Sequence, residues 1–402
     1  MMSYEIKRAA RHDYPFALMV IDCDNFKPIN DNFGHAFGDK FLQTVANILE
    51  EEKRDEDIVA RYGGDEFTII LPECNENGAL TVANRISKKI EDEKLIAPDG
   101  SRVGITISIG ICVYPIHTLS QKDMFVIADH MMYQAKEEGK NSVKIPNERD
   151  ISNILKTNQE KSSLLIRAIE NDEIYPYFQP IKPASASNKL VIHELLMRIH
   201  QDGKIVSAYE FIEIAEARGL INSMDLMVIE KAFKEIQRTQ YEGILFINLS
   251  PKSLIVGDFI NKINAFVLKY EINKEKIVFE ITERETVKNF SLLEKFVHNL
   301  KSDGYKFAID DFGSGFSSFH YIKKFPIDYV KIDGDFIINI NKDIKDKAFV
   351  NSIVTLAKEL KIQTIAEFVE NEEIVDVLNE LEIDYYQGFH IGKPSEKFIS
   401  FK

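Results

Sequence analysis

Hydrophobic residues in the first part of the chain alternate between the spacing of buried strands and that of amphipathic helices. Apolar runs of strand length are Ala17–Ile21, Phe67–Leu71 and Val103–Val113, and helical periodicity covers Asp39–Glu52, Ala79–Ile90 and Gln121–Glu138. This alternation predicts an α/β domain over residues 1–145. The more polar residues 146–160 are predicted to form a linker, partly helical because Ile151, Ile154 and Leu155 keep an apolar stripe.

The second part, residues 161–402, repeats one pattern more regularly. Its strand-like runs are Tyr177–Ile181, Ile192–Arg198, Leu245–Leu249, Ile277–Thr282, Phe307–Asp311, Tyr329–Ile332, Thr364–Val369 and Tyr385–Phe389. Amphipathic segments such as Ile221–Arg238 and Phe290–Asp303 separate most of them, which predicts an α/β fold of the (βα)8 TIM-like barrel type. Residues 182–191 are too few for a parallel crossover, so the first strand is expected to run antiparallel to the second.

The composition limits where the protein works and what it binds. A chain of 402 residues exceeds one ordinary core, which agrees with two domains. No apolar stretch reaches the ~20 residues of a membrane span and the start lacks a signal-peptide core, so no membrane segment and a cytoplasmic location are expected. The 3 cysteines show no metal-binding spacing and are expected to be reduced thiols. A net charge of −14 argues against a polymeric nucleic acid as ligand, because such binding depends on Lys and Arg.

Two adjacent carboxylates are the most informative polar feature. Asp310 and Asp311 close an apolar run and lead into the turn Phe312-Gly313-Ser314-Gly315. Ionised neighbours at a strand end repel each other unless a cation compensates them. Carboxylate oxygens suit hard divalent ions, so the sequence predicts Mg²⁺ or Mn²⁺ at this position.

Further polar residues interrupt the apolar runs where a barrel brings the carboxyl ends of its strands together. They are Glu194, Asn248, Glu280, Lys331, Glu367 and Gln387. Each one alone is typical of a surface residue or of half a salt bridge, but the set predicts a site for phosphodiester hydrolysis. Oxygen ligands for one or two ions are expected from Glu194, Asn248, Glu280 and Asp310, with Asp311 at a second position.

The remaining residues of this site have expected roles in the chemistry. Lys331 is expected to orient the attacking water or to stabilise charge on the phosphoryl oxygens. Glu367 is the expected general base, and Arg198 is expected to hold a non-bridging phosphate oxygen.

The motifs of the second part resemble those of EAL-domain cyclic di-GMP phosphodiesterases. The matching segments, in the family's order, are Gln179-Pro180-Ile181, Glu194-Leu195-Leu196-Met197-Arg198, Asn248-Leu249-Ser250, Glu280-Ile281-Thr282-Glu283, the turn after Asp310, Lys331-Ile332-Asp333, Ala366-Glu367 and Gln387-Gly388. The resemblance implies Mg²⁺- or Mn²⁺-dependent opening of cyclic di-GMP to linear pGpG. It also implies that Gln179 and Gln387 contact the substrate and that Glu283 steadies the Asp-Asp loop. Leu195 stands for the usual Ala and Phe368 for the usual Gly, and neither change removes a ligand.

A second acidic pair lies in the first part. Asp22 follows one buried strand, and Gly63-Gly64-Asp65-Glu66 precedes another. Paired glycines permit positive φ and a close approach of a ligand. Asp22 and Asp65 are therefore predicted to form a metal pair for a triphosphate, with a charged hairpin tip as the alternative. There is no P-loop motif, so a nucleotide would have to be held in another way.

The wider pattern of the first part is similar to the GGDEF diguanylate cyclase family. Matches in order include Asn30, Gly34-His35-Ala36-Phe37-Gly38-Asp39, Ser108-Ile109-Gly110, Tyr133-Gln134-Ala135-Lys136 and Gly139-Lys140-Asn141. The resemblance implies metal binding by Asp22 and Asp65, guanine reading by Asn30 and Asp39, Glu66 beside the reacting 3′-hydroxyl, and phosphate contacts from Lys27, Lys136 and Lys140. The family's usual opening segment has no match, because the chain begins inside the first helix.

A product-inhibition site is also implied by this resemblance. Arg54-Asp55-Glu56-Asp57 matches the family's RxxD motif at the usual spacing before Gly63, and Arg85 is expected to join Arg54 and Asp57.

Three functions remain open from the sequence. The first is a cyclic di-GMP phosphodiesterase regulated by a GTP-binding first domain, and the absent opening segment favours it. The second is a bifunctional enzyme that also joins two GTP molecules, which would need two such domains facing each other, so a homodimer is expected. The third is a receptor that binds cyclic di-GMP without catalysis; it is disfavoured because no expected metal ligand is missing.

Overall fold

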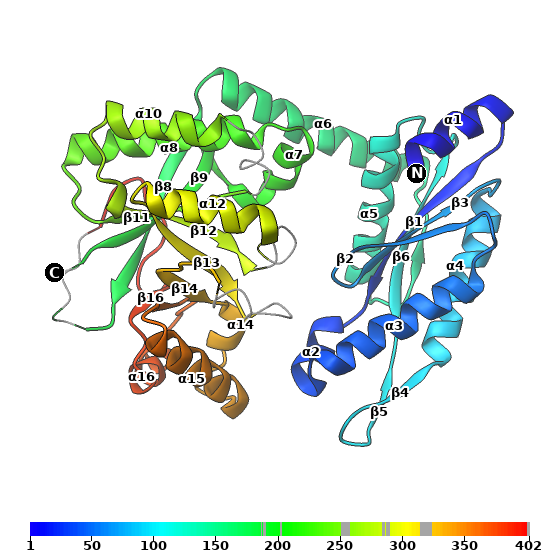
Figure 1. The fold of residues 1–402 in the computed structure, drawn as a ribbon. Coiled ribbons are helices and arrows are strands. Elements are labelled where there is room, and N and C mark those ends of the chain that lie inside the picture. The colour runs from blue at the N-terminus through cyan, green and yellow to red at the C-terminus, as the bar shows by residue number, and fades with distance from the viewer. Residues whose placement is uncertain are drawn as a thin grey trace. The chain divides into compact units, whose positions relative to one another are not determined.

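The computed structural model describes residues 1–402 except 186, 188–189, 202, 251–257, 284–285, 287–289, 314–323 and 400–402. The chain forms two compact units, Met1–Glu160 and Lys161–Lys402 (Figure 1). Ser314 and Gly315, the end of the predicted metal-binding turn, lie outside the described residues. None of the described helices is both long and apolar enough to cross a membrane.

A five-stranded sheet with helices on both faces forms the first unit. Its strands are β1 (Phe16–Cys23), β2 (Ile58–Gly63), β3 (Glu66–Leu71), β6 (Ile107–Tyr114) and β7 (Val143–Lys144), in the order β2-β3-β1-β6-β7. The helices are α1 (Met2–His12), α2 (Phe26–Phe33), α3 (His35–Glu52), α4 (Glu76–Asp92) and α5 (Gln121–Glu137), and a separate hairpin joins β4 (Lys94–Ile96) to β5 (Arg102–Gly104).

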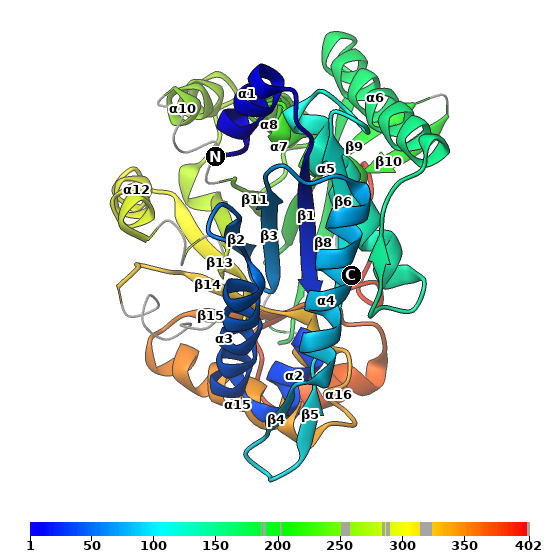
Figure 2. The ribbon, with the colours of Figure 1, turned by 90° about the vertical axis from the view of Figure 1, so that its right-hand side faces the viewer.

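Strand β1 is the central strand of this sheet, and every one of its residues is buried. Ala17, Met19 and Ile21 pack with α3 and α4 on one face, and Figure 2 shows these two helices running in roughly the direction of the strands. Phe16 and Leu18 alternate with them and pack with α5 on the opposite face. The alternation therefore gives a three-layer unit, which confirms the predicted α/β class.

The predicted strand Val103–Val113 is wrong in one respect, because the structure divides it. Its first residues belong to β5, in the β4–β5 hairpin, and its last to β6 in the main sheet. The break falls at Thr106, whose carbonyl accepts a hydrogen bond from Asp24 N at 3.0 Å. Of the predicted linker, residues 148–160 form the first part of α6 (Glu148–Glu170), a continuous helix in which Ile154 is buried.

The second unit is a closed barrel of eight strands. Their bounds are β8 (Ile174–Pro183), β9 (Ile192–Gln201), β11 (Ile244–Asn248), β12 (Ile277–Thr282), β13 (Lys306–Phe312), β14 (Tyr329–Ile332), β15 (Gln363–Ala366) and β16 (Tyr385–Gln387). Strand β8 pairs antiparallel with both β9 and β16, so it closes the barrel and confirms the predicted antiparallel first strand. A short strand, β10 (Lys204–Ser207), extends β9 as a hairpin.

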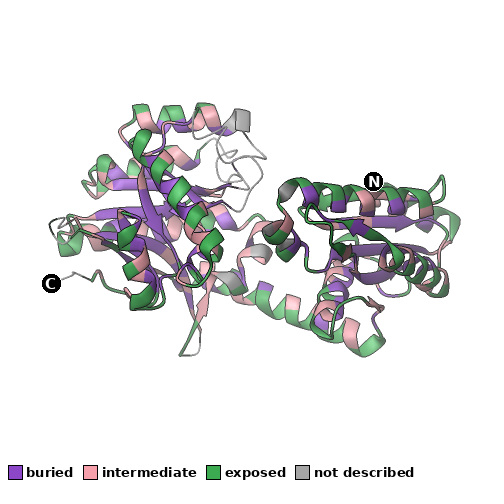
Figure 3. Ribbon diagram, turned by 90° about the horizontal axis from the view of Figure 1, so that it is seen from below, coloured by how far each residue is buried: buried purple, intermediate pink, exposed green. Residues whose placement is uncertain are grey.

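Helices surround the barrel and cover its apolar outer face. They are α7 (Ile212–Ala217), α8 (Ile221–Thr239), α10 (Phe259–Lys269), α12 (Phe290–Ser302), α14 (Gly334–Ile337), α15 (Ile344–Glu359) and α16 (Glu372–Glu380), with 3-10 turns at Ala208–Glu210 and Lys274–Lys276. In Figure 3 the strands are buried, whereas the helices are exposed on the side away from them. This burial on both faces explains why the strands read as continuous apolar runs.

Candidate active site

A ring of polar side chains lies one layer above the apolar filling of the barrel. The filling includes Ile192, Phe246, Val278, Ala308, Tyr329, Ile365 and Tyr385, one from each parallel strand. Two residues after each of these, in the same order, come Glu194, Asn248, Glu280, Asp310, Lys331, Glu367 and Gln387. Because side chains two apart on a strand share a face, the ring points into the barrel at the carboxyl ends of its strands.

Lys331 links four carboxylates of this ring. Its Nζ lies 2.9 Å from Glu367 Oε1, 3.0 Å from Asp310 Oδ1, 3.3 Å from Glu280 Oε2 and 3.4 Å from Glu194 Oε2. The lysine side chain is 1% exposed. Burial alone would lower the pKa of Lys331, but the surrounding carboxylates, with Asp310 foremost, raise it well above its ordinary value. The surrounding carboxylates therefore favour the charged ammonium form of Lys331.

Glu194 is the carboxylate of the ring with the most hydrogen-bond donors. Asn248 Nδ2 donates to Glu194 Oε1 at 2.7 Å, and Gln387 Nε2 donates to Oε2. Burial tends to raise the pKa of Glu194, but Lys331 and the amides of Gln387 and Asn248 outweigh it, so the pKa is lowered. Glu194 is thus held ionised and in a fixed orientation.

The pKa values of Glu280 and Glu367 are raised, in contrast to that of Glu194. Burial, followed by the neighbouring carboxylates, raises the pKa of Glu280 well above its usual range. Burial and then Asp310 do the same for Glu367. The surroundings thus disfavour the ionised forms of Glu280 and Glu367 and favour that of Glu194. This contrast indicates that the ring holds more negative charge than Lys331 compensates.

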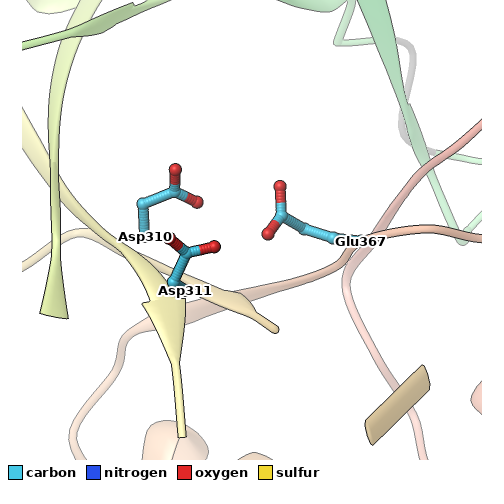
Figure 4. Close-up of side chains that lie close together, drawn as sticks. All are labelled: Asp310, Asp311 and Glu367. Atoms are coloured by element: carbon cyan, nitrogen blue, oxygen red, sulfur yellow. The ribbon is translucent and has the colours of Figure 1, made fainter. Parts of the chain in front are cut away.

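Three carboxylates of the described residues lie close enough together to share a metal ion: Asp310, Asp311 and Glu367. One oxygen from each lies within 4.8 Å of the others, and Figure 4 shows the three carboxylates turned toward a common space. Asp310 and Asp311 come from the end of β13, and Glu367 follows β15. The strand prediction Thr364–Val369 is therefore too long: β15 ends at Ala366.

The local backbone turns these side chains toward one another. Asp311 has φ 52° and Gly313 has φ 106°, so the chain turns sharply directly after Asp310. The N–H of Gly313 donates to Glu283 Oε2 at 2.7 Å, so the carboxylate of Glu283 holds the turn. Phe368 also has a positive φ, 50°, which redirects the chain directly after Glu367.

The donor set fits a divalent cation. Both carboxylate oxygens of Glu280 and Oδ1 of Asp310 are buried and lack a partner in hydrogen-bond geometry among the described residues, although Lys331 is within ion-pair distance. Buried carboxylate oxygens are costly to leave unpaired, and hard cations satisfy them. Burial followed by Asp310 raises the pKa of Asp311 to about 6, as expected for a carboxylate crowded by another.

Two further predicted substrate contacts line the same region. Gln179 lies on β8 in register with Glu194 on β9, and its Nε2 donates weakly to Gly392 O at 3.4 Å. The guanidinium of Arg198 lies 5.8 Å from the ring centroid of Tyr177, and its Nη1 donates to Met197 O at 2.8 Å. Arg198 shares its strand face with Glu194, so it lies farther along the same face.

In the first unit, Asp22 is buried at the end of β1 and paired with a lysine. Lys136 Nζ, from the last turn of α5, lies 2.8 Å from Asp22 Oδ2, whereas Oδ1 is buried without a hydrogen-bond partner among the described residues. Asp65 lies at the β2–β3 hairpin tip, and its carbonyl accepts from Cys23 N at 3.2 Å. Glu66 is in register with Asp22. Burial, with a further contribution from Asp65, raises the pKa of Asp22 to about 6 against the effect of Lys136.

The other predicted nucleotide contacts lie on α2, on α3 and in the turn after α5. Asn30 lies on α2 with its Oδ1 buried and without a partner among the described residues, and Asp39 is exposed on α3. Lys140 Nζ donates to Asn25 Oδ1 at 2.5 Å. The side chain of Lys27 lies outside the described residues.

The predicted inhibitory motif forms a compact turn. Arg54 N donates to Asp57 Oδ2 at 2.7 Å, and Asp57 N donates to Arg54 O at 3.1 Å. The guanidinium of Arg85, on α4, binds Glu52 Oε2 at 2.5 Å and Glu52 O at 2.8 Å. Arg85 thus reaches the segment before the turn through Glu52, which the sequence did not single out.

Sequence patterns assigned no role to Asp24, yet it is 2% exposed and makes two hydrogen bonds at the edge of this site. Its oxygens accept from Ser108 Oγ at 2.7 Å and from Asn141 N at 2.9 Å. The only feature of the nearby sequence that could have drawn attention to Asp24 is its position two residues after Asp22. Its partners are more than 80 residues away, so their contact cannot be read locally.

Comparisons with known proteins agree with this geometry. The EAL domain family matches residues 164–394, and the family described as "Diguanylate cyclase, GGDEF domain" matches residues 1–142. The chain is 34% identical over 385 residues to the cyclic di-GMP phosphodiesterase PdeB of Shewanella oneidensis, covering 94% of this chain and 45% of PdeB. It is 30% identical over 396 residues to the bifunctional diguanylate cyclase/cyclic di-GMP phosphodiesterase MucR of Pseudomonas aeruginosa, covering 97% of this chain and 57% of MucR.

A solved structure described as the PaMucR phosphodiesterase in complex with c-di-GMP is also similar. It shares 26% identity and a TM-score of 0.55, with 59% of this chain and 97% of that chain covered. The chain spans about half the length of PdeB and of MucR. With more than half of its residues matched by one family, the chain belongs to the EAL domain family and has a GGDEF domain in its first unit.

Proposed function

We propose that this protein hydrolyses one phosphodiester of cyclic di-GMP to give linear pGpG, with Mg²⁺ or Mn²⁺ as cofactor, and that its first unit binds GTP and regulates this reaction. The observation that supports it most strongly is the buried ring around Lys331, with Asp310, Asp311 and Glu367 converging at the carboxyl ends of the barrel strands. The names of PdeB and MucR, and the cyclic di-GMP in a related structure, support the same substrate.

The residues of the ring divide the work of such a reaction. Glu194, Asn248, Glu280, Asp310 and Asp311 are the proposed metal ligands. A bound divalent cation would polarise the phosphodiester and lower the pKa of the attacking water. Glu367 is the proposed general base: a cation bound beside it would favour its ionised form, and that carboxylate would then accept the proton of the water. Lys331 Nζ, in its charged form, stabilises the negative charge that develops on the phosphoryl oxygens.

Substrate orientation is proposed for residues at the rim of the ring. Gln387 and Asn248 hold Glu194 by its two oxygens, so an amide at either position fixes this carboxylate before substrate arrives. Arg198 and Gln179 lie along β9 and β8 on the Glu194 face, where they can bind the phosphate and sugar of a dinucleotide.

Product analysis tests the proposal directly. Incubation with cyclic di-GMP and either Mg²⁺ or Mn²⁺, followed by separation of nucleotides, should yield pGpG, and chelation should stop it. Glu194→Ala should abolish the product. Glu230→Gln, which alters an exposed ion pair on α8 with Lys269, should leave the rate unchanged. Binding of cyclic di-GMP without any pGpG would instead identify a receptor.

Synthesis of cyclic di-GMP is a second candidate, favoured by the buried oxygens of Asp22 and Asn30 that have no hydrogen-bond partner in the described part of the chain. Joining two GTP molecules would bring two copies of the first unit together, so this activity would need a homodimer. Incubation with GTP and Mg²⁺, combined with sedimentation analysis, tests both. If GTP instead changes only the rate or KM of pGpG formation, the first unit is regulatory.

A further inference from the structure

The end of α5 and the end of β1 are joined at Asp24. Residues 139–142, called here the 139–142 turn, follow α5 and include three consecutive positive φ angles: 122° at Gly139, 65° at Lys140 and 45° at Asn141. Two of these residues are not glycine, and each such conformation costs roughly 1–2 kcal/mol. Contacts elsewhere must therefore hold the 139–142 turn in place.

Asp24 supplies the central contact. Its Oδ2 accepts from Asn141 N at 2.9 Å, its Oδ1 accepts from Ser108 Oγ at 2.7 Å, and its own N–H donates to Thr106 O at 3.0 Å. With 2% exposure and a donor on each carboxylate oxygen, Asp24 is occupied by protein contacts. This differs from Asp22, which has a buried oxygen without a hydrogen-bond partner among the described residues.

The two segments that Asp24 joins each contribute to the proposed nucleotide site. Residues 22–25 include Asp22, and the segment from α5 into the 139–142 turn includes Lys136 and Lys140. Lys136 Nζ pairs with Asp22, and Lys140 Nζ pairs with Asn25, whose φ is 56°. Both lysine contacts are thus made across the junction that Asp24 fixes.

We propose that Asp24 is a positioning residue for a nucleoside triphosphate: it fixes the 139–142 turn so that the cations at the end of α5 and the carboxylate of Asp22 face one ligand. The proposal rests on the proposed GTP binding by the first unit. The role is geometric, so it depends on the two hydrogen bonds of Asp24 and not on its charge.

Three substitutions separate geometry from charge. Asp24→Asn keeps both bonds, because the amide oxygen can accept from Asn141 N while the amide nitrogen donates to Ser108 Oγ. Asp24→Ala removes both. Asn141→Gly keeps the backbone N–H and suits φ 45°, and it loses only the carboxamide that donates to Glu91 Oε1 at 3.1 Å.

Calorimetric titration of the full chain with the magnesium complex of a non-hydrolysable GTP analogue provides the test. Asp24→Asn and Asn141→Gly should bind within about threefold of the unaltered chain, and Asp24→Ala at least about tenfold more weakly, as expected for lost buried hydrogen bonds. Asp24→Asn as weak as Asp24→Ala would show that charge matters and would overturn the proposal. Wild-type affinity in Asp24→Ala would overturn it as well.

The outcomes also separate this proposal from the one on which it rests. No binding by the unaltered chain removes the nucleotide role of the first unit, and the positioning role with it. Binding by the unaltered chain and equally by all three variants removes the positioning role alone. Should Asp24→Ala fail to fold, the affinity of Asp24→Asn still decides between geometry and charge.

Discussion

Lys331 Nζ lies 2.9 Å from Glu367 Oε1, and both side chains are buried inside the barrel. The same ammonium is within 3.4 Å of Glu194, Glu280 and Asp310. A buried ammonium that faces four carboxylates neutralises part of their charge, in addition to its proposed role in stabilising charge on the phosphoryl oxygens. Stability and the proposed hydrolysis should therefore both depend on this one side chain.

Replacing Lys331 by Met should show both roles. The variant should form no pGpG, and in EDTA at neutral pH its free energy of unfolding should fall by about 3–5 kcal/mol, because buried carboxylates lose their counter-charge. Urea unfolding measures the second effect. Lys301→Met is the matched control: this lysine pairs with Asp328 at 2.6 Å but is 28% exposed, so the loss should stay under about 1 kcal/mol. Equal losses in both variants would contradict the role assigned to Lys331.

Asp311 should make stability depend on pH. Its pKa is raised to about 6, chiefly by burial, from an ordinary value of 3.8, so the folded protein binds a proton more readily than the unfolded chain. Stability from this group therefore increases as pH falls through about 6 toward 3.8, and it is absent above that range. In EDTA, Asp311→Asn should be more stable than the unaltered chain at pH 7.5, with the difference vanishing near pH 4.

Asparagine is a fair replacement at this position because it tolerates the positive φ of Asp311. Saturating Mn²⁺ should reverse the order of stability at pH 7.5, since the variant lacks one of the proposed metal ligands. A constant stability difference between the two proteins across this pH range would show that Asp311 is not crowded by negative charge in the folded state.

The ring of the barrel could be predicted because its signal is local. Each polar member comes two residues after an apolar residue of the barrel interior, so the strand period alone puts Glu194 above Ile192 and Lys331 above Tyr329. The short connection before Ile192 likewise revealed the antiparallel first strand. Both features depend on residues that are close in sequence: the spacing of two along a strand, and the length of the connection between two successive strands.

Relations between distant segments could not be predicted in this way. Strand β2 escaped notice because it is an edge strand with exposed residues such as Arg61 and Tyr62, so it lacks an apolar run. The division of Val103–Val113 coincides with a hydrogen bond from Asp24 N to Thr106 O, and apolar periodicity continues across it. The Asp22–Lys136 pair likewise depends on how α5 packs against β1.

Phe368 and Gly334 should be coupled. Phe368 is 55% exposed with φ 50°, and a Cβ built on Gly334 would lie 2.2 Å from its ring. Gly334→Ala should therefore displace the ring and lower both stability and hydrolysis. Phe368→Gly should change the free energy of unfolding by no more than about 1 kcal/mol, because relief of strain offsets the greater freedom of glycine in the unfolded chain.

A double-mutant cycle measures this coupling. In the Phe368→Gly background, Gly334→Ala should be nearly neutral, since the ring that it would displace is gone. Additive effects of the two substitutions would mean that the ring and Gly334 act independently. Retention of pGpG formation in Phe368→Gly would show that the phenylalanine is tolerated beside Glu367 and not required for the reaction.

Gly38 should be needed for nucleotide recognition and not for folding. A Cβ at this position of α3 would lie 1.7 Å from Asn30 Oδ1, so Gly38→Ala must move the carboxamide that is proposed to read guanine. Alanine also favours a helix by roughly 0.5–1 kcal/mol over glycine, so stability should change little. The expected result is weaker binding of GTP with Mg²⁺ and a smaller preference for GTP over ATP. Gly78→Ala on α4, where the nearest atom is Cys74 Sγ at 3.0 Å, is the matched control and should leave affinity and preference unchanged. Unchanged guanine preference in Gly38→Ala would remove Asn30 from the recognition of the base.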